Sequence, residues 1–265
     1  MSKISDVIHE NTLPYLRIEA LVQNLTLTLE YDGTAYHGWQ VQPGLPTIQG
    51  ALEETIKRIS GEEVRVIGAG RTDAGVHALG QVANFRTSKG LALDTWRRAF
   101  NGLLPADIVV HRVEHAPDEF DARRSATRKT YRYSIWNAPF PSALERHCVL
   151  HIPDPLDVAS MAQGATFLIG EHDFSAFRAA DDSPPHPVRR VVEARFAQEA
   201  NRIHFIITGN GFLKHMIRII VGTLLDVGRG RLSPEDLERI LHSKDRQKAG
   251  RTAPPHGLCL VEVMY

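Results

Sequence analysis

The sequence predicts an α+β protein built from two ferredoxin-like domains, each with the element order βαββαβ. Three observations support this prediction: stretches in which apolar and polar residues alternate, stretches with apolar residues at helical spacing, and the same order of both kinds in each half. No low-complexity linker separates the halves. We therefore expect two mixed or antiparallel sheet domains, residues 24–116 and 117–265, packed around a central cleft, with residues 1–23 as an amino-terminal extension.

The first domain is expected to open with a strand over residues 25–31, where leucine and tyrosine alternate with polar residues. Thr47 can cap a helix that Gly61 ends, because a threonine hydroxyl satisfies free backbone N–H groups and glycine tolerates the left-handed turn after a helix. Asp94 can cap a second helix that runs to Leu103. The remaining predicted strands are 64–67, 81–85 and 108–113.

The second domain repeats this order. A strand around Tyr131 precedes a helix that Asp157 opens and Gly170 closes. A hairpin and a helix stopped by Gly228 follow, and Ser233 with proline at the next position starts a shorter helix. These elements and the last strand are predicted over the ranges 131–135, 157–170, 188–196, 203–208, 211–227, 233–236 and 258–263.

The composition is that of a soluble globular protein large enough to bury a core: 265 residues, 43% hydrophobic and 23% charged. The formal net charge is zero, so any binding of nucleic acid must come from local basic faces. The two cysteines, Cys148 and Cys259, lack metal-type spacing, and the 13 histidines form no HxH or HExxH cluster. We expect a reduced protein without a metal site.

The start of the chain resembles neither a secretory signal nor a transit peptide, because it is mixed in charge and has no long apolar block. The longest apolar stretch, 212–227, is interrupted by two basic residues and a histidine. It is too short and too charged to span a bilayer. A cytoplasmic protein that does not enter a membrane is therefore expected.

One acid stands in a tight, glycine-rich turn: Asp73, within the run GAGRTDAGVHALGQV (68–82). Little side-chain bulk surrounds it, so a large substrate can approach the carboxylate, and Arg71 nearby favours its charged form. This pattern predicts a nucleophile or base at the floor of a cleft. A plain turn aspartate, or a turn ion pair with Arg71, is the structural alternative.

The same run does not match the known phosphate-binding loops. The dinucleotide fingerprint needs a glycine where Asp73 stands, and the P-loop needs Lys followed by Ser or Thr where Val76 and His77 stand. An acid in the loop would also repel phosphate.

The densest basic stretch of the chain surrounds Tyr131 and interleaves cations with aromatic rings. Cations that hold phosphates beside rings on which bases stack are typical of proteins that grip single-stranded or flipped nucleotides. A strand whose aromatic residues face the core is the alternative. The members are Arg123, Arg124, Arg128, Lys129, Tyr131, Arg132, Tyr133 and Trp136.

The predicted helix that ends at Gly228 carries Lys214 and Arg218 one helical turn apart, so they are expected to share a face. Two cations near a helix amino terminus can favour a bound anion. A solvated charged face explains the same pattern.

Six segments together resemble the TruA-type tRNA pseudouridine synthases, and the resemblance runs from about residue 24 to the end. They occur in the family's order, and the second of them, the glycine-rich run, is specific by itself. The segments are YDGTAYHGWQ (31–40), GRTDAGVHALGQV (70–82), FDARRSATRKTYRYSIWN (120–137), HDFSAFR (172–178), GFLKHMIRIIVGTLLDVG (211–228) and GLCLVEVMY (257–265).

This resemblance implies that Asp73 is essential to catalysis, that Tyr131 stacks on the target uracil, and that Arg71 helps to displace the base. It also implies that Arg218 lies near the catalytic carboxylate. The family fold implies two α+β domains around a basic catalytic cleft, in a homodimer that uses neither cofactor nor metal. The substrate implied is tRNA, at positions 38, 39 and 40 of the anticodon stem-loop.

The implied chemistry suits a single acid, because converting uridine to pseudouridine oxidises nothing and adds no group. The carboxylate can attack the sugar, or take a sugar proton to give a glycal-like intermediate. Both routes need Asp73 ionised, with Arg218 or Arg71 as its partner. Two other classes fit parts of the pattern: a non-catalytic tandem RNA-binding protein, and a small-molecule hydrolase or lyase that uses Asp73 with His77.

Overall fold

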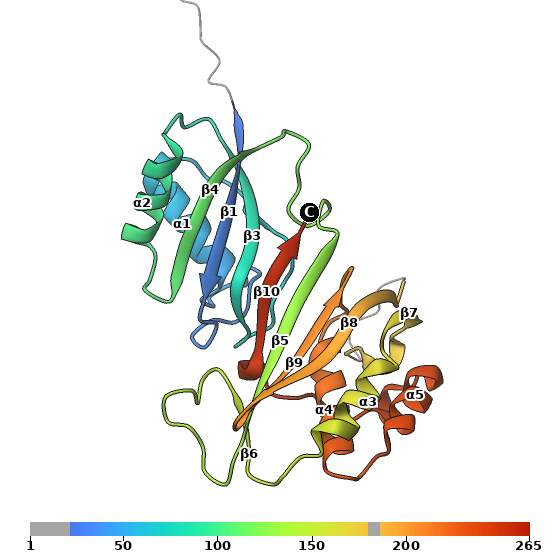
Figure 1. Cartoon of the computed structure of the whole chain (residues 1–265). Helices are drawn as coiled ribbons and strands as arrows, with labels where there is room; N and C mark the ends of the chain where they lie inside the picture. Colours follow the sequence, from blue (N-terminus) through green and yellow to red (C-terminus); the bar gives the residue numbers. More distant parts are fainter. Residues whose placement is uncertain (1–21, 180–185) are drawn as a thin grey trace, which may run out of the picture.

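A computed structural model describes residues 22–179 and 186–265, and in these ranges it holds one mixed sheet of ten strands and five α-helices (Figure 1). The α+β class is confirmed. The predicted extension, residues 1–23, lies outside the described residues except for its last two, of which Gln23 already belongs to the first strand.

The amino-terminal half has the predicted order βαββαβ. Its four strands lie where the sequence predicted them. The second strand covers only two residues, at the end of the predicted stretch 64–67. The elements are β1 (Gln23–Tyr31), α1 (Ile48–Ser60), β2 (Ile67–Gly68), β3 (His77–Thr87), α2 (Leu93–Leu103) and β4 (Ile108–Ala116).

The carboxyl-terminal half contains every predicted element and two short strands, β6 and β7, that the sequence patterns did not indicate. Its elements are β5 (Arg128–Asn137), β6 (Leu150–Ile152), α3 (Val158–Thr166), β7 (Gly170–Asp173), β8 (Val188–Glu199), β9 (Arg202–Gly209), α4 (Met216–Gly228), α5 (Pro234–Ser243) and β10 (Leu258–Met264).

The two halves use the same strand arrangement, β4-β1-β3-β2 in the first and β10-β5-β9-β8 in the second. Along β3, residues 83 and 84 pair with β2, whereas residues 77 and 78 pair in parallel with Cys259 and Leu260 of β10. This short parallel seam joins the halves into one sheet. The division into domains at residue 116 stays a prediction.

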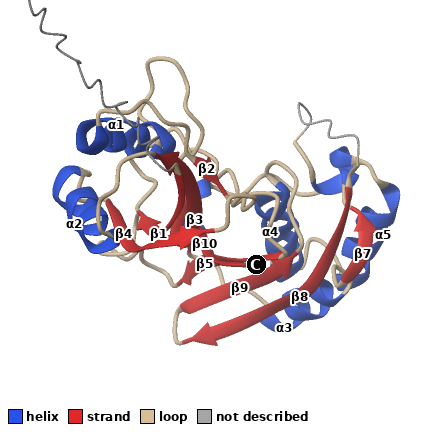
Figure 2. Ribbon diagram, turned by 90° about the horizontal axis from the view of Figure 1, so that it is seen from above, coloured by secondary structure: helices blue, strands red, loops and turns tan. Residues whose placement is uncertain are grey.

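The helices form two groups, α1 and α2 beside the strands of the first half and α3, α4 and α5 beside those of the second (Figures 1 and 2). In the first half, the buried leucines of β1 belong to the same core as both helices. Phe85 of β3 contacts Trp96 of α2 edge-on, with ring centroids 5.4 Å apart. The alternation seen in the sequence thus directs one face of the sheet to the helices.

The ends of α1 and α5 follow the sequence signals. The Thr47 side chain accepts a hydrogen bond from the backbone of Gly50, and Gly61 takes the left-handed conformation, with φ of 80°. Ser233 and Asp236 form a reciprocal capping box at the start of α5. Asp94 does not cap α2, because the cap residue is Ala92; Asp94 lies in the first turn, where acids are favoured by the helix dipole.

Two predicted helices are shorter in the structure. Helix α3 ends at Thr166, and Gly170 begins β7 instead of closing the helix. Helix α4 starts at Met216, because His215 takes the left-handed conformation with φ of 61° and breaks the helical path. Lys214 therefore precedes the helix, and the expectation that it shares a helical face with Arg218 is wrong.

The parallel seam between β3 and β10 predicts a stability effect at Gly80. A Cβ atom at this position would lie 2.4 Å from the backbone oxygen of Val261 on β10. We expect Gly80→Ala to lower the free energy of unfolding by about 1–3 kcal/mol, because the two strands would have to separate locally. Urea unfolding followed by circular dichroism measures this change.

Gly90→Ala is the matched control. Nothing lies within 4 Å of a Cβ atom built there, so its unfolding free energy should stay within about 0.5 kcal/mol of the wild type. Equal stability of the two variants would contradict the close approach at the seam.

Candidate active site

Asp73 lies in the turn that joins β2 to β3. The backbone N–H of Val76 donates to the Asp73 carbonyl at 3.1 Å, and Gly75 takes a left-handed φ of 76°. The Gly75 N–H donates to the carbonyl of Tyr36 at 3.2 Å. Glycine at this point lets the chain reverse tightly beside the acid.

The loop that follows β1 packs against the turn of Asp73 and is hydrogen bonded to it. The N–H of Trp39 donates to the carbonyl of Thr72 at 3.0 Å. A Cβ atom on Gly38 would lie 2.5 Å from that oxygen, and Gly38 also has a positive φ of 88°. Only glycine allows the two backbones to come this close. The segment YDGTAYHGWQ thus supports the acid-bearing turn.

Hydrogen bonds from buried polar side chains of the sheet hold the turn of Asp73. The Tyr31 hydroxyl and the Thr72 Oγ1 are hydrogen bonded at 2.9 Å, and the Gln81 amide donates to the carbonyl of Gly70 at 2.9 Å. The same amide also lies 3.4 Å from the Tyr31 hydroxyl. Burial raises the pKa of Tyr31 to about 12, so the phenol is neutral at physiological pH. The network ties the turn to β1 and β3.

Arg218 lies in the first turn of α4 and faces Asp73 from the other half of the chain. Its Nη1 is 2.9 Å from the Asp73 Oδ2, and its Nε donates to the backbone oxygen of Ala253 at 2.8 Å. The His215 Nε2 is 3.6 Å from the same Oδ2. The Asp73 side chain remains 28% exposed and that of Arg218 13%, so the pair is partly shielded and still open to a ligand.

Arg71 behaves differently from Arg218. Its side chain is exposed and makes no hydrogen bond or ion pair with any residue in the described ranges. Of the two arginines considered as partners for Asp73, the structure brings Arg218 into contact and leaves Arg71 at the rim.

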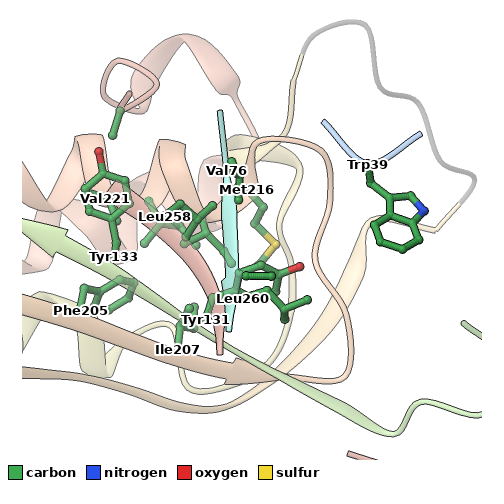
Figure 3. Packing of buried hydrophobic residues seen from close by; sticks show 14 of the residues in the cluster. Trp39, Val76, Tyr131, Tyr133, Phe205, Ile207, Met216, Val221, Leu258 and Leu260 are labelled. Carbon is green, nitrogen blue, oxygen red and sulfur yellow. The ribbon is translucent and has the colours of Figure 1, made fainter. Parts of the chain in front are cut away.

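Tyr131 lies on β5 between two neighbouring strands, opposite Leu260 of β10 and Ile207 of β9. Its ring meets Phe212 edge-on, with centroids 5.3 Å apart, and 7% of the residue is exposed. Figure 3 shows the Tyr131 ring beside Leu260 and Met216, with its hydroxyl pointing away from them. Burial, with the negative charge of Asp73 nearby, raises the pKa of the Tyr131 phenol.

All four predicted site residues line one cleft of about 990 Å³. Residues of both halves form its wall. Among the lining residues, one is a carboxylate and six are lysine or arginine, so the cleft is locally basic although the chain is neutral. The charged lining residues are Asp73, Arg71, Arg123, Lys129, Arg189, Lys214 and Arg218.

The described residues contain neither a metal-type cluster of side chains nor a membrane-spanning helix. Across residues 22–179 and 186–265, no three or more histidine, cysteine or acidic side chains gather in a way that could hold a metal ion. No helix in the same ranges combines the length and apolarity needed to cross a membrane.

The chain matches the model of a family described as tRNA pseudouridine synthase, over residues 28–123 and 165–265. The chain belongs to this family. It is therefore an isomerase. Asp73 and Arg71 fall in the first matched segment and Arg218 in the second, whereas Tyr131 lies between the two.

Curated relatives agree with the family match. A protein named tRNA pseudouridine synthase A from Caldicellulosiruptor bescii is 50% identical over 244 residues, which are 92% of this chain and all of that protein. Proteins of the same name from Acetivibrio thermocellus and Caldicellulosiruptor saccharolyticus are 48% and 47% identical, with the same coverage of both chains.

Sequence reasoning missed three residues of this candidate site. His215 and Phe212 were treated as parts of a regular helix, so their approach to Asp73 and Tyr131 was not expected. Gln81 was read only as a strand residue, although a fully buried glutamine in the middle of a strand needs hydrogen-bond partners. That last signal was present in the sequence, because apolar residues surround Gln81.

The buried network predicts a positioning role for Tyr31. We expect Tyr31→Phe to lower kcat about tenfold and leave the Kd for tRNA nearly unchanged, because Thr72 loses its partner and the acid-bearing turn loosens. Single-turnover kinetics and filter binding separate the two quantities.

Tyr36→Phe is the matched control, because the Tyr36 hydroxyl donates to Asp107 at 2.6 Å and not to a residue of the turn. It should lower stability without lowering kcat. A Tyr31→Phe enzyme with wild-type kcat would show that the network does not position the turn.

Proposed function

We propose that this chain isomerises uridine to pseudouridine at positions 38, 39 and 40 in the anticodon stem-loop of tRNA, with Asp73 as the essential acid. The observation that carries the proposal is the Asp73–Arg218 contact at 2.9 Å inside a basic cleft. Family membership and the names of the relatives support tRNA as the substrate. The resemblance of the six sequence segments supports the three positions.

The reaction breaks the bond between the uracil nitrogen and the sugar, turns the base, and rejoins it through ring carbon five. The hydrogen on that carbon then leaves as a proton. No group enters and nothing is oxidised, so one carboxylate is sufficient. Asp73 either attacks the sugar carbon or removes a sugar proton, and both routes use the ionised acid.

Arg218 supplies the counter-charge that keeps a carboxylate in a partly shielded cleft. The hydrogen bond from its Nε to Ala253 fixes the plane of the guanidinium. One nitrogen can therefore hold Asp73 while the other carboxylate oxygen stays available to the sugar.

The target uridine must leave its stack before it can react, at a cost of about a few kcal/mol. We propose that the Tyr131 ring offsets part of this cost by contact with the uracil, since base–aromatic stacking contributes about 1–3 kcal/mol. Phe212 holds that ring from the side. Arg71, exposed at the rim, is the residue we propose to occupy the place that the base leaves.

Two further parts of the proposal do not depend on the site. The homodimer rests on the resemblance alone, and the cytoplasmic location is the one expected from the sequence. Size-exclusion chromatography with light scattering tests the first of these.

Asp73→Asn tests the central proposal. We expect turnover to fall at least about 10³-fold, because the amide can neither attack the sugar nor accept its proton. The Kd for tRNA should stay within about threefold, because the basic lining remains. The measurement is tritium release from tRNA labelled at ring carbon five of uridine.

Asp173→Asn is the matched control for Asp73→Asn. Asp173 also forms an ion pair, with Lys244 at 3.1 Å, but it is not part of the cleft lining. Its turnover should be that of the wild type. Full tritium release by Asp73→Asn would contradict the proposed role of the acid.

Tyr131 variants test the base contact. No residue in the described part of the chain is hydrogen bonded to the Tyr131 hydroxyl, so Tyr131→Phe should stay within about threefold of the wild-type kcat/KM. Tyr131→Ala should lose about 10–100-fold, the equivalent of one stacked base. The same tritium assay measures both; equal losses would argue against stacking.

A further inference from the structure

Lys129 is a cleft residue to which the catalytic proposal assigns no role. It lies on β5 two residues before Tyr131, and side chains two apart on a strand point to the same face. A Cβ atom on Gly70 would lie 3.6 Å from the Lys129 Cε and 3.7 Å from the Tyr131 hydroxyl oxygen. Both side chains therefore end beside the turn that carries Asp73.

The positive charge of Lys129 is poorly compensated. The side chain is half-buried, and burial together with the nearby charge of Arg123 lowers the pKa of its ammonium group. Neither Lys129 nor Arg123 makes a side-chain hydrogen bond or ion pair within the part of the chain that the structure describes. The ammonium group of Lys129, half-buried and close enough to the exposed Arg123 to feel its charge, therefore favours a bound anion.

Among the described residues that line the cleft, no carboxylate is free to neutralise Lys129 and Arg123. Asp73 is the one carboxylate of the cleft lining, and it is already bound to Arg218. The anion must then come with the substrate. In a uridine, the uracil oxygens carry partial charge, whereas each flanking phosphate carries a full negative charge that would balance the pair.

We propose that Lys129 and Arg123 bind one of the two phosphates that flank the target uridine while its uracil contacts Tyr131. This inference rests on the proposed function. Residues two apart on a strand are separated by about 6.7 Å, which is within the span of one nucleotide. The strand thus holds a base and a neighbouring phosphate at two fixed points, and presents the sugar between them to Asp73.

The test is a double-mutant cycle between Lys129 and the phosphate. Full-length tRNA is prepared by ligation with one uncharged methylphosphonate linkage, placed either 5′ or 3′ of the target uridine. We expect Lys129→Met to lower kcat/KM on unmodified tRNA about tenfold, and the methylphosphonate at the contacted side to lower the wild-type value by a similar factor. Combining the two should cost no further loss.

Additional readouts separate a charge contact from a structural role. Lys129→Arg should recover most of the lost kcat/KM, because it restores the cation. Lys129→Met should also reduce the slope of log K for tRNA binding against log salt concentration by about 0.7–0.9, the equivalent of one phosphate. Lys57→Met is the control that should change neither quantity, because Lys57 lies on α1, outside the cleft lining, in an exposed ion pair with Glu63.

The phosphate contact would be overturned if the losses in kcat/KM from Lys129→Met and from the methylphosphonate multiplied at both linkages. A Lys129→Met enzyme with wild-type kcat/KM would overturn it as well. A different result, no tritium release from unmodified tRNA by the wild type, would overturn the proposed function itself. The two failures are thus told apart by the unmodified substrate.

Discussion

The ion pair between Asp73 and Arg218 is the contact on which the geometry of the site depends. Its partners are 145 residues apart and belong to different halves of the chain. Each partner is held independently. The turn of Asp73 is held by the hydrogen bond between Thr72 and the Tyr31 hydroxyl. The Arg218 guanidinium is held by its hydrogen bond to the backbone oxygen of Ala253. A carboxylate and a guanidinium held from both sides keep their orientation without reorganisation when a substrate arrives.

The sheet sets the distance between the turn of Asp73 and the backbone of Ala253, which holds Arg218. Strand β3 begins just after the turn of Asp73, and β10 begins a few residues after Ala253, and the two strands pair in parallel. His77, the first residue of β3, adds a second link, because its ring is hydrogen bonded to the backbone oxygens of His147 and His256 and to the N–H of Gly33. The last strand of the chain therefore holds the acid from one half opposite the arginine from the other.

Local signals predicted the elements well, and their limits show where tertiary contacts decide. Thr47 and Gly61 mark the ends of α1 because capping depends on neighbouring backbone groups alone. The start of α4 could not be read in this way, since the apolar spacing continues through residues 211–215 although His215 is left-handed. The choice between Arg71 and Arg218 as the partner of Asp73 depended on packing across the sheet, which spacing along the sequence does not contain.

A basic cleft with a single acid raises an electrostatic problem, and the ion pair resolves it. An isolated carboxylate would repel the phosphates that the surrounding cations attract. With Arg218 at 2.9 Å, the Asp73 charge is balanced locally, so the remaining lysines and arginines present a positive field to a polyanion. Under the proposed function, Arg218 keeps Asp73 ionised and oriented for reaction with the sugar. By balancing its charge, Arg218 also lets RNA approach Asp73. Catalysis and binding thus both depend on Arg218, because its loss would leave the Asp73 charge unbalanced, and a substitution there should disturb both even where the fold is intact.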